Sequence, residues 1–197
     1  QSPYELNITW YSALNREGSG ESQDLRVARF LAARAIALAL RGVPGIYLPT
    51  LFGAKNDTDA VLKGAEKRSI NRRTFDEASL MRMLDDPECW VSQVARGMRR
   101  LVRRRIEQPA FHPNASQQVL PLDPHVFGVF RAREGEQQLV ALTNVTPDEQ
   151  RVRLPVADVG GASLWQDVLS RARYQAVDGV LSLRLPPYGV AWLSAVV

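Results

Sequence analysis

A polar loop from Leu51 to Arg73 contains the side chains with the most evident chemistry in this sequence. It reads LFGAKNDTDAVLKGAEKRSINRR, with small, polar and mostly basic residues and no clear apolar face. Asn56 and Asp57 can hydrogen-bond hydroxyl groups, and the cationic side chains can bind an anion. A loop of this length inside a compact domain is usually either functional or disordered. Cationic donors come from Lys55, Lys67, Arg68, Arg72 and Arg73.

Composition excludes several other kinds of site. Cys89 is the single cysteine, so an internal disulfide and a cysteine-built metal site are both excluded. The two histidines, His112 and His125, have no serine or cysteine partner arranged as a catalytic triad. The longest apolar run, near residues 35–40, is far shorter than the roughly 20 residues that a spanning helix needs. We therefore expect a soluble, cytoplasmic protein without a membrane partner.

The basic residues are unevenly distributed. The net charge is +4, and 22 of the 25 basic residues are arginine, many of them in ARGMRRLVRRR at residues 95–105. Apolar residues at helical spacing in the same segment place these arginines on the opposite face of a predicted helix. A solvated helical face explains this pattern better than a nucleic-acid surface, since no known nucleic-acid motif accompanies it.

The first half of the chain has an α/β rhythm. A helix is predicted from Ser22, a suitable N-cap, to Leu40, and Gly42 and Pro44 end it. The segment GIYLPTL predicts a short buried strand from Gly45 to about Leu48 or Thr50. Two more helices are predicted after the polar loop, at about residues 76–86 and 88–108.

The second half is predicted to be all-β. From Gln118 onward, short β-branched or alternating runs are separated by Gly, Pro, Asp and Asn turns. The residue pattern changes near residues 110–116 from helix-forming segments to these short runs. We therefore expect one domain at 1–112 and a small antiparallel β domain at 113–197.

Several motifs resemble those of known enzymes. GVPGIYLPTLFGAKND resembles the eighth barrel strand and the following loop of the α-amylase-type glycoside enzymes, in glycoside hydrolase family 13. AKND followed by RSINRR, and SPYELNITWYSALN near the start, are similar to motifs of the sucrose phosphorylase branch, while PYELN and PAFHP are closer to its glucosylglycerate phosphorylases. YGVAWLSA resembles the last strand of that branch's C-terminal domain.

The resemblance implies an α/β plus all-β fold: the C-terminal end of a (β/α)8 TIM barrel, followed by the β domain. Because barrel enzymes place their active site at the C-terminal ends of the strands, the polar loop would lie over the catalytic mouth. The chain would be a fragment whose partner is the upstream half of the same barrel. The resemblance implies no metal or organic cofactor, with inorganic phosphate as co-substrate. The oligomeric state is not indicated.

The resemblance also implies roles for individual residues. Arg72 matches the family arginine that helps to hold the glucosyl ring, although an arginine paired with a nearby acid would look the same. Asn71 would help to fix the loop or cap a helix. Tyr4 and Glu5 match the loop that shapes the acceptor and phosphate side of the pocket, where sucrose phosphorylases usually have glutamine at the position of Glu5.

The whole enzyme would transfer glucosyl from glucosylglycerate to phosphate with retention and give α-glucose 1-phosphate. Sucrose, sucrose-phosphate or glucosylglycerol phosphorylase activity is the alternative. In the family the catalytic carboxylates lie upstream, so no catalytic residue is expected in this segment. The alternative from another class of protein is a non-catalytic sugar-binding or basic interaction module.

Overall fold

The computed structural model describes residues 6–196, which form two compact units. Among the described residues, the first unit comprises 6–30 and 45–99, and the second comprises 31–44 and 100–196. Each unit is described separately below. The predicted domain boundary between residues 112 and 113 stays a prediction.

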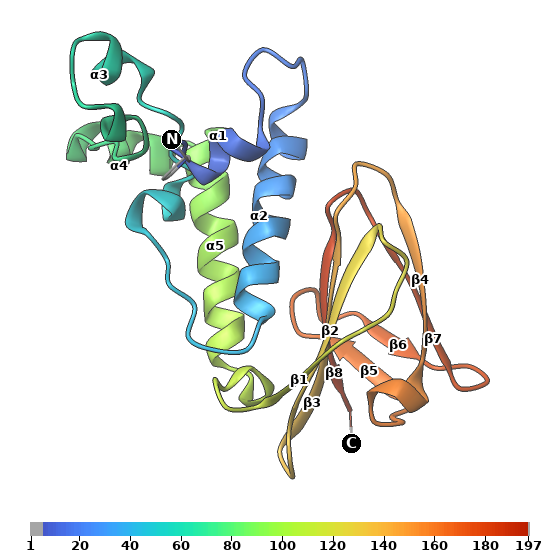
Figure 1. The fold of residues 1–197 in the computed structure, drawn as a ribbon. Coiled ribbons are helices and arrows are strands. Elements are labelled where there is room, and N and C mark those ends of the chain that lie inside the picture. Colours follow the sequence, from blue (N-terminus) through green and yellow to red (C-terminus); the bar gives the residue numbers. More distant parts are fainter. Residues whose placement is uncertain (1–5, 197) are drawn as a thin grey trace, which may run out of the picture. The chain divides into compact units, whose positions relative to one another are not determined.

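Two long helices, α2 (Gln23–Ala39) and α5 (Trp90–Ile106), each begin in the first unit and end in the second. Near their starts, the side-chain amide of Gln23 donates to Gln93 Oε1 at 3.0 Å, and near their ends Arg105 donates to the carbonyl of Leu38 at 2.6 Å. Within each unit, the parts of α2 and α5 that belong to it therefore lie side by side (Figure 1). Both were predicted, and Ser22 caps α2 by accepting a hydrogen bond from Leu25 N at 3.3 Å.

The polar loop of the first unit is folded into short helical turns. Asp57 is the N-cap of α3 within the loop, and Asp76 is the N-cap of α4, which follows the loop. The predicted helix at residues 76–86 is therefore confirmed. The short elements of this unit are α1 (Trp10–Leu14), η1 (Leu48–Phe52), α3 (Thr58–Leu62), η2 (Lys67–Asn71) and α4 (Glu77–Asp85).

The predicted strand from Gly45 to Leu48 or Thr50 is wrong. The chain is irregular up to Tyr47 and then forms the 3-10 helix η1, with Pro49 in its first turn. A strand needs a neighbour to pair its backbone N–H and C=O groups, and no other strand occurs in the part of the first unit that the structure describes. The apolar run GIYL was consistent with a buried strand, but without a partner strand a turn that starts at proline is the better solution.

The second unit contains a β domain of two antiparallel sheets. The larger sheet has the strand order β1-β2-β3-β8-β5-β6, and β4 pairs with β7 in the smaller one. The predicted antiparallel β domain is confirmed. The strands are β1 (Ser116–Val119), β2 (Val126–Arg133), β3 (Gln137–Asn144), β4 (Gln150–Pro155), β5 (Leu164–Asp167), β6 (Arg173–Gln175), β7 (Val180–Leu185) and β8 (Val190–Ala195), with the turns η3 (Pro109–Phe111) and η4 (Val156–Val159).

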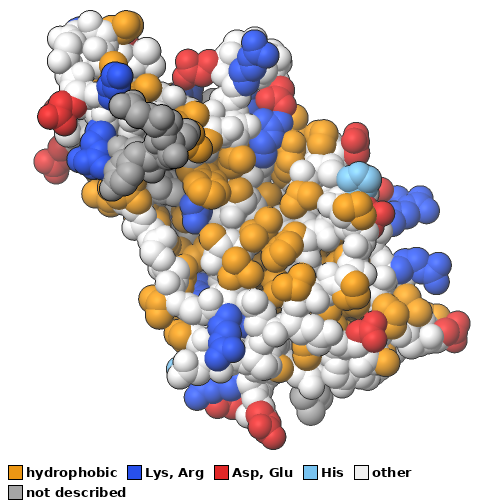
Figure 2. Space-filling model, in the orientation of Figure 1, with side chains coloured by type: hydrophobic (Ala, Val, Ile, Leu, Met, Phe, Trp, Pro, Cys, Tyr) orange, Lys and Arg blue, Asp and Glu red, His pale blue; other side chains and the backbone are white. Residues whose placement is uncertain are grey.

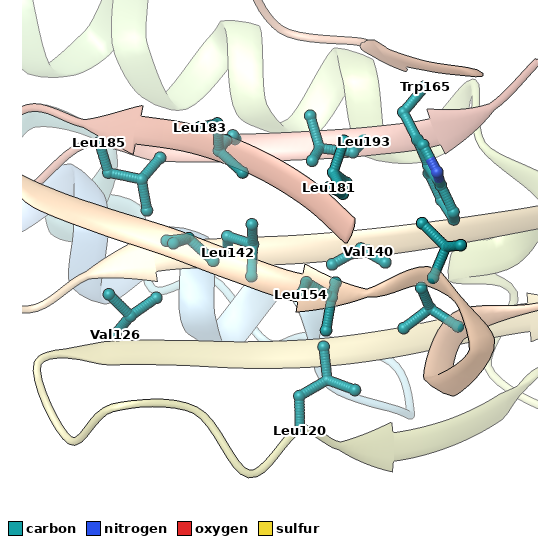
Figure 3. Packing of buried hydrophobic residues seen from close by; sticks show 14 residues of the cluster. Leu120, Val126, Val140, Leu142, Leu154, Trp165, Leu181, Leu183, Leu185 and Leu193 are labelled. Atoms are coloured by element: carbon teal, nitrogen blue, oxygen red, sulfur yellow. The ribbon is translucent and has the colours of Figure 1, made fainter. Parts of the chain in front are cut away.

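The main hydrophobic core lies between the two sheets. Leu142 of β3 and Leu193 of β8 point into it from the larger sheet, and Leu154 of β4 and Leu181 of β7 point into it from the smaller sheet (Figure 3). All four side chains are at most 2% exposed. Such burial contributes about 1.5 to 3 kcal/mol for each leucine, so the β domain has a substantial core of its own.

The opposite face of the larger sheet contains two aromatic residues and a buried charge. Phe111 of η3 packs edge-on against Trp192 of β8, with ring centroids 4.8 Å apart. Arg131 of β2 is fully buried beside them, and its guanidinium donates to the carbonyls of Ala39 at 2.7 Å, Ser116 at 3.0 Å and His112 at 3.0 Å. This arginine therefore joins the end of α2 to the sheet.

A buried asparagine joins two loops of the same domain. The side-chain Nδ2 of Asn144 donates to the carbonyls of Asp148 at 2.7 Å and Pro186 at 2.8 Å, and its Oδ1 accepts from the backbone N–H of Thr146 at 2.9 Å. Asn144 is 0% exposed, so these contacts replace water for its whole amide group.

Candidate functional site

A pocket of about 540 Å³ in the first unit is the strongest candidate for a binding site. It lies between the segment around α1, the turn at η1 and the η2 helix of the polar loop. Two of the residues predicted for the site, Asn71 and Arg72, are in its lining. The lining residues are Ile8, Thr9, Trp10, Tyr11, Phe30, Tyr47, Pro49, Thr50, Ala54, Arg68, Asn71 and Arg72.

The η2 helix presents the polar groups of this pocket. In a 3-10 helix, side chains three residues apart eclipse one another, so Arg68 lies in line with Asn71. Arg72 follows as the C-cap, and its backbone N–H donates to the carbonyl of Ser69 at 3.1 Å. Both arginines are exposed residues of the pocket lining.

Two exposed aromatic residues add apolar surface to the pocket. Trp10 is 50% exposed and Tyr47 is 57% exposed, and both are in the lining. Tyr11 also contributes to the wall, but it is only 3% exposed and packs against Phe30 at 5.5 Å between ring centroids. Burial raises the pKa of Tyr11, which is consistent with a neutral core residue. Of these two neighbouring residues, Trp10 is therefore the one whose ring is exposed at the pocket.

Tyr47 is a residue that sequence reasoning missed. It was assigned to a buried strand, whereas the turn at η1 leaves it exposed at the pocket. Figure 2 shows apolar side chains at the surface on the face viewed there, and exposed apolar residues of this unit include Leu6, Trp10 and Leu48. The presence of tyrosine beside a proline-containing turn is a signal that could have placed it at the surface.

Asn56 and Asp57 hold the loop in place. Asn56 Oδ1 accepts from the backbone N–H of Thr9 at 2.8 Å, and the Asn56 N–H donates to Ser12 Oγ at 3.0 Å. Asp57 Oδ1 accepts from Ala60 N at 3.2 Å as the N-cap of α3. Neither residue lines the pocket. In the structure, both residues therefore hold the loop in its conformation. Their predicted contact with substrate stays a prediction.

The remaining predicted site residues are separated from the pocket lining or lie outside the described chain. Lys55 Nζ lies 4.1 Å from the centroid of the Trp90 ring, a cation–π contact. Lys55 and Arg73 line a second hollow of about 270 Å³. Tyr4 and Glu5 lie outside the described residues.

The turn that separates Lys55 from the pocket depends on a glycine. Gly53 has φ +58°, and a Cβ at that position would lie 3.0 Å from Val94 Cγ2 and 3.1 Å from Tyr11 Cδ2. The carbonyl of Gly53 also accepts a hydrogen bond from Trp90 Nε1 at 3.1 Å. Glycine is therefore required by both the backbone conformation and the space available.

The arginine-rich face of α5 is largely engaged by its own chain. Arg96 donates to the carbonyl of Pro87 at 2.8 Å, Arg104 pairs with Glu107 at 2.8 Å, and Arg105 reaches the end of α2. This arrangement favours the interpretation of a structural and solvated face over a nucleic-acid surface. No helix in the described part of the chain is long and apolar enough to cross a membrane.

Known proteins are similar to this chain in both units. A family model described as the C-terminal immunoglobulin-like domain of D-apionate lactonase matches residues 124–193. The chain is 40% identical over 150 residues to a glucosylglycerate phosphorylase of Allomeiothermus silvanus, which covers 76% of this chain and 27% of the relative. It is 32% identical over 199 residues to the glucosylglycerate phosphorylase of Spirochaeta thermophila, covering 98% of this chain and 34% of that relative. The chain thus spans about a third or less of the length of these relatives.

The fold resembles that of α-amylase-type enzymes. A crystal structure of AmyP in complex with maltose matches 95% of this chain and 38% of its own, with a TM-score of 0.72 and 16% identity. The predicted fold class, the end of a (β/α)8 barrel followed by an antiparallel β domain, is confirmed by this likeness. Within that class the chain is homologous to the sucrose phosphorylase-type enzymes of glycoside hydrolase family 13, with its higher identity and coverage among glucosylglycerate phosphorylases.

Proposed function

We propose that this chain is part of a retaining α-glucoside phosphorylase that transfers glucosyl from glucosylglycerate to phosphate and releases α-glucose 1-phosphate. The observation that carries the proposal is the 40% identity to a glucosylglycerate phosphorylase over 76% of the chain. The enzyme would act in the cytoplasm, with inorganic phosphate as co-substrate and without a metal or organic cofactor.

The pocket supplies the kinds of group that such a reaction needs. Arg72 would hold the glucosyl ring by charge-assisted hydrogen bonds to its hydroxyls, with Asn71 beside it. Trp10 and Tyr47 would offer ring faces to the apolar side of the sugar, because both are half exposed in the same lining. The polar loop would then be a binding element that Asn56 and Asp57 hold in shape.

The reaction chemistry would come from another part of the same protein. In retaining glycoside chemistry, one carboxylate attacks the anomeric carbon and a carboxylic acid protonates the leaving oxygen. Phosphate would then attack the glucosyl-enzyme and take over the glucosyl group. The residues of this chain would bind and orient both substrates.

Phosphorolysis by the full-length protein tests the proposal. Glucosylglycerate, sucrose and glucosylglycerol would each be offered with phosphate, and α-glucose 1-phosphate would be measured. We expect glucosylglycerate to be the preferred substrate. Sucrose turnover equal to or above that of glucosylglycerate would favour a sucrose phosphorylase instead. Absence of phosphorolysis with all three would contradict the proposed class of reaction.

A further inference from the structure

One short segment of the polar loop hydrogen-bonds to all three walls of the pocket of about 540 Å³. This linking segment comprises residues 53–57, and each bond joins one of its residues to one wall. The bonds run from Ala54 N–H to the Pro49 carbonyl of η1 at 3.0 Å, from Thr9 N–H, at the start of α1, to Asn56 Oδ1 at 2.8 Å, and from Asp57 N–H to the Ile70 carbonyl of η2 at 2.8 Å. The position of the linking segment therefore sets the positions of the three walls.

A tryptophan of α5 holds the linking segment from outside the pocket. Trp90 Nε1 donates to the carbonyl of Gly53 at 3.1 Å, and Lys55 Nζ lies 4.1 Å from the centroid of the Trp90 ring. Trp90 and Lys55 line the second hollow of about 270 Å³, and neither is in the described lining of the pocket. Trp90 therefore contacts the linking segment at two residues without itself facing a ligand in the pocket.

The chemistry of the indole suits both contacts. An indole combines an N–H donor with the aromatic face that attracts a cation most strongly. Phenylalanine has the face without the donor, and leucine has neither. Substitutions at Trp90 can therefore separate the hydrogen bond to Gly53 from the cation–π contact with Lys55.

We propose that Trp90 is a positioning residue for the glucosyl site: it fixes the linking segment, and the linking segment fixes the spacing of the three pocket walls. The inference rests on the proposed function, in which Asn71 and Arg72 at the end of η2 bind the glucosyl ring. A displacement of a binding group by about 1 Å can cost about a hundredfold in rate, so a contact outside the pocket can control turnover.

Kinetics of variants of the full-length protein test this role. Trp90→Phe removes the donor and keeps the aromatic face, Trp90→Leu removes both, Lys55→Met removes the cation, and Lys55→Arg keeps it. Two variants are matched controls: Gln93→Ala breaks the hydrogen bond between Gln93 and Gln23 about one turn along α5, and Lys63→Met removes an exposed charge of the same loop. The value of kcat/KM for phosphorolysis of glucosylglycerate would be measured well below the melting temperature of each variant. Circular dichroism would verify folding.

We expect Trp90→Phe and Lys55→Met each to lower kcat/KM by roughly tenfold, Trp90→Leu by more, and the two controls by less than about twofold. Lys55→Arg should retain most of the activity that Lys55→Met loses. Because Lys55 acts through the Trp90 ring, Lys55→Met should cause no further loss in the Trp90→Leu background. A purely structural role would lower the melting temperature and leave kcat/KM of the folded enzyme unchanged.

The proposal is overturned by any of three results in folded variants of an active enzyme. These are wild-type kcat/KM in both Trp90→Phe and Lys55→Met, a loss from Lys55→Met that is equally large in the Trp90→Leu background, or losses of the same size in the two controls. If Trp90→Leu does not fold, the second result is replaced by an equal loss in Lys55→Arg and Lys55→Met. Such results leave the phosphorylase function standing, whereas a wild-type protein that phosphorolyses none of the three glucosides overturns both proposals.

Discussion

The guanidinium of Arg131 on strand β2 donates a hydrogen bond to the carbonyl of Ala39, 92 residues earlier, at 2.7 Å. Ala39 is the last residue of α2, where the C-terminal carbonyls lack partners within the helix. Arg105 reaches the same region through Leu38 and through Gly42 at 2.9 Å. Burial, and then the charges of Arg105 and Arg41, lower the pKa of Arg131 to about 10, so it stays charged at neutral pH.

Replacing Arg131 should destabilise the second unit strongly. Arg131→Met would leave one buried and two partly buried carbonyls without their donor, and we expect a loss on the order of 3 kcal/mol. Arg133→Met, on the same strand, removes an exposed ion pair with Glu136 and should change stability by less than about 1 kcal/mol. Thermal unfolding of the full-length variants measures both. Equal melting temperatures would contradict the structural role of Arg131.

Gly53 should not tolerate a side chain. In Gly53→Ala the new methyl group would have to displace Val94 or Tyr11, and a non-glycine residue in the left-handed region costs about 1 to 2 kcal/mol by itself. Gly45→Ala is the control, because Gly45 has an ordinary φ and open space around its Cβ position. A lower melting temperature for Gly53→Ala alone is expected. If Gly45→Ala is equally harmful, the packing argument at Gly53 is wrong.

The start of α4 should be sensitive to acid. Hydrogen bonds from the Ser79 hydroxyl, and then from its backbone N–H, lower the pKa of Asp76. Because the folded state binds this proton less readily, the contribution of Asp76 is present above its unfolded pKa and is lost as pH falls through its folded pKa. Asp76→Asn keeps an N-cap that does not titrate.

Melting temperatures of wild type and Asp76→Asn, measured from neutral to acidic pH, distinguish an N-cap that titrates from one that does not. The wild-type protein should lose stability relative to the variant as the pH falls toward the pKa of the Asp76 carboxyl group. Curves that stay parallel over this range would show that the Asp76 carboxylate does not contribute.

Arg72 should be required for turnover in the full-length enzyme. Arg72→Ala would remove charge-assisted hydrogen bonds to the glucosyl ring, and we expect a loss of roughly 2 to 4 kcal/mol of transition-state binding, or about a hundredfold or more in kcat/KM. Arg72→Lys should recover only part of the rate, because the planar fork is lost. Arg73→Ala, next in sequence but lining the other hollow, is the control. Near wild-type rates in Arg72→Ala would refute the donor-site role.

Elements with strong local signals could be predicted from the sequence. The helices around Val27 and Val94 follow from apolar spacing, an N-cap at Ser22 and helix-ending residues. The long strands β2, β3, β7 and β8 follow from β-branched runs between turn residues.

Elements that depend on distant partners could not be predicted. Strands β5 and β6 have four and three residues, too few for a pattern, and they exist because β5 pairs with β8. The predicted strand at Gly45 fails for the converse reason, since it has no partner. The sequence also did not distinguish the cations of the polar loop, because which of them line a hollow depends on the turn at Gly53 and on η2.

The buried amide of Asn144 has a further consequence. Asn144, Val145 and Thr146 form an N-glycosylation sequon, and the sugar would be attached at Nδ2. That nitrogen donates to backbone carbonyls inside the folded β domain and is closed to an enzyme. Expression through a eukaryotic secretory pathway could modify it only before the domain closes, and the attached glycan would then keep the loops of Asp148 and Pro186 apart. Glycan occupancy at Asn144 would therefore report the fraction of chains that were glycosylated before the β domain folded.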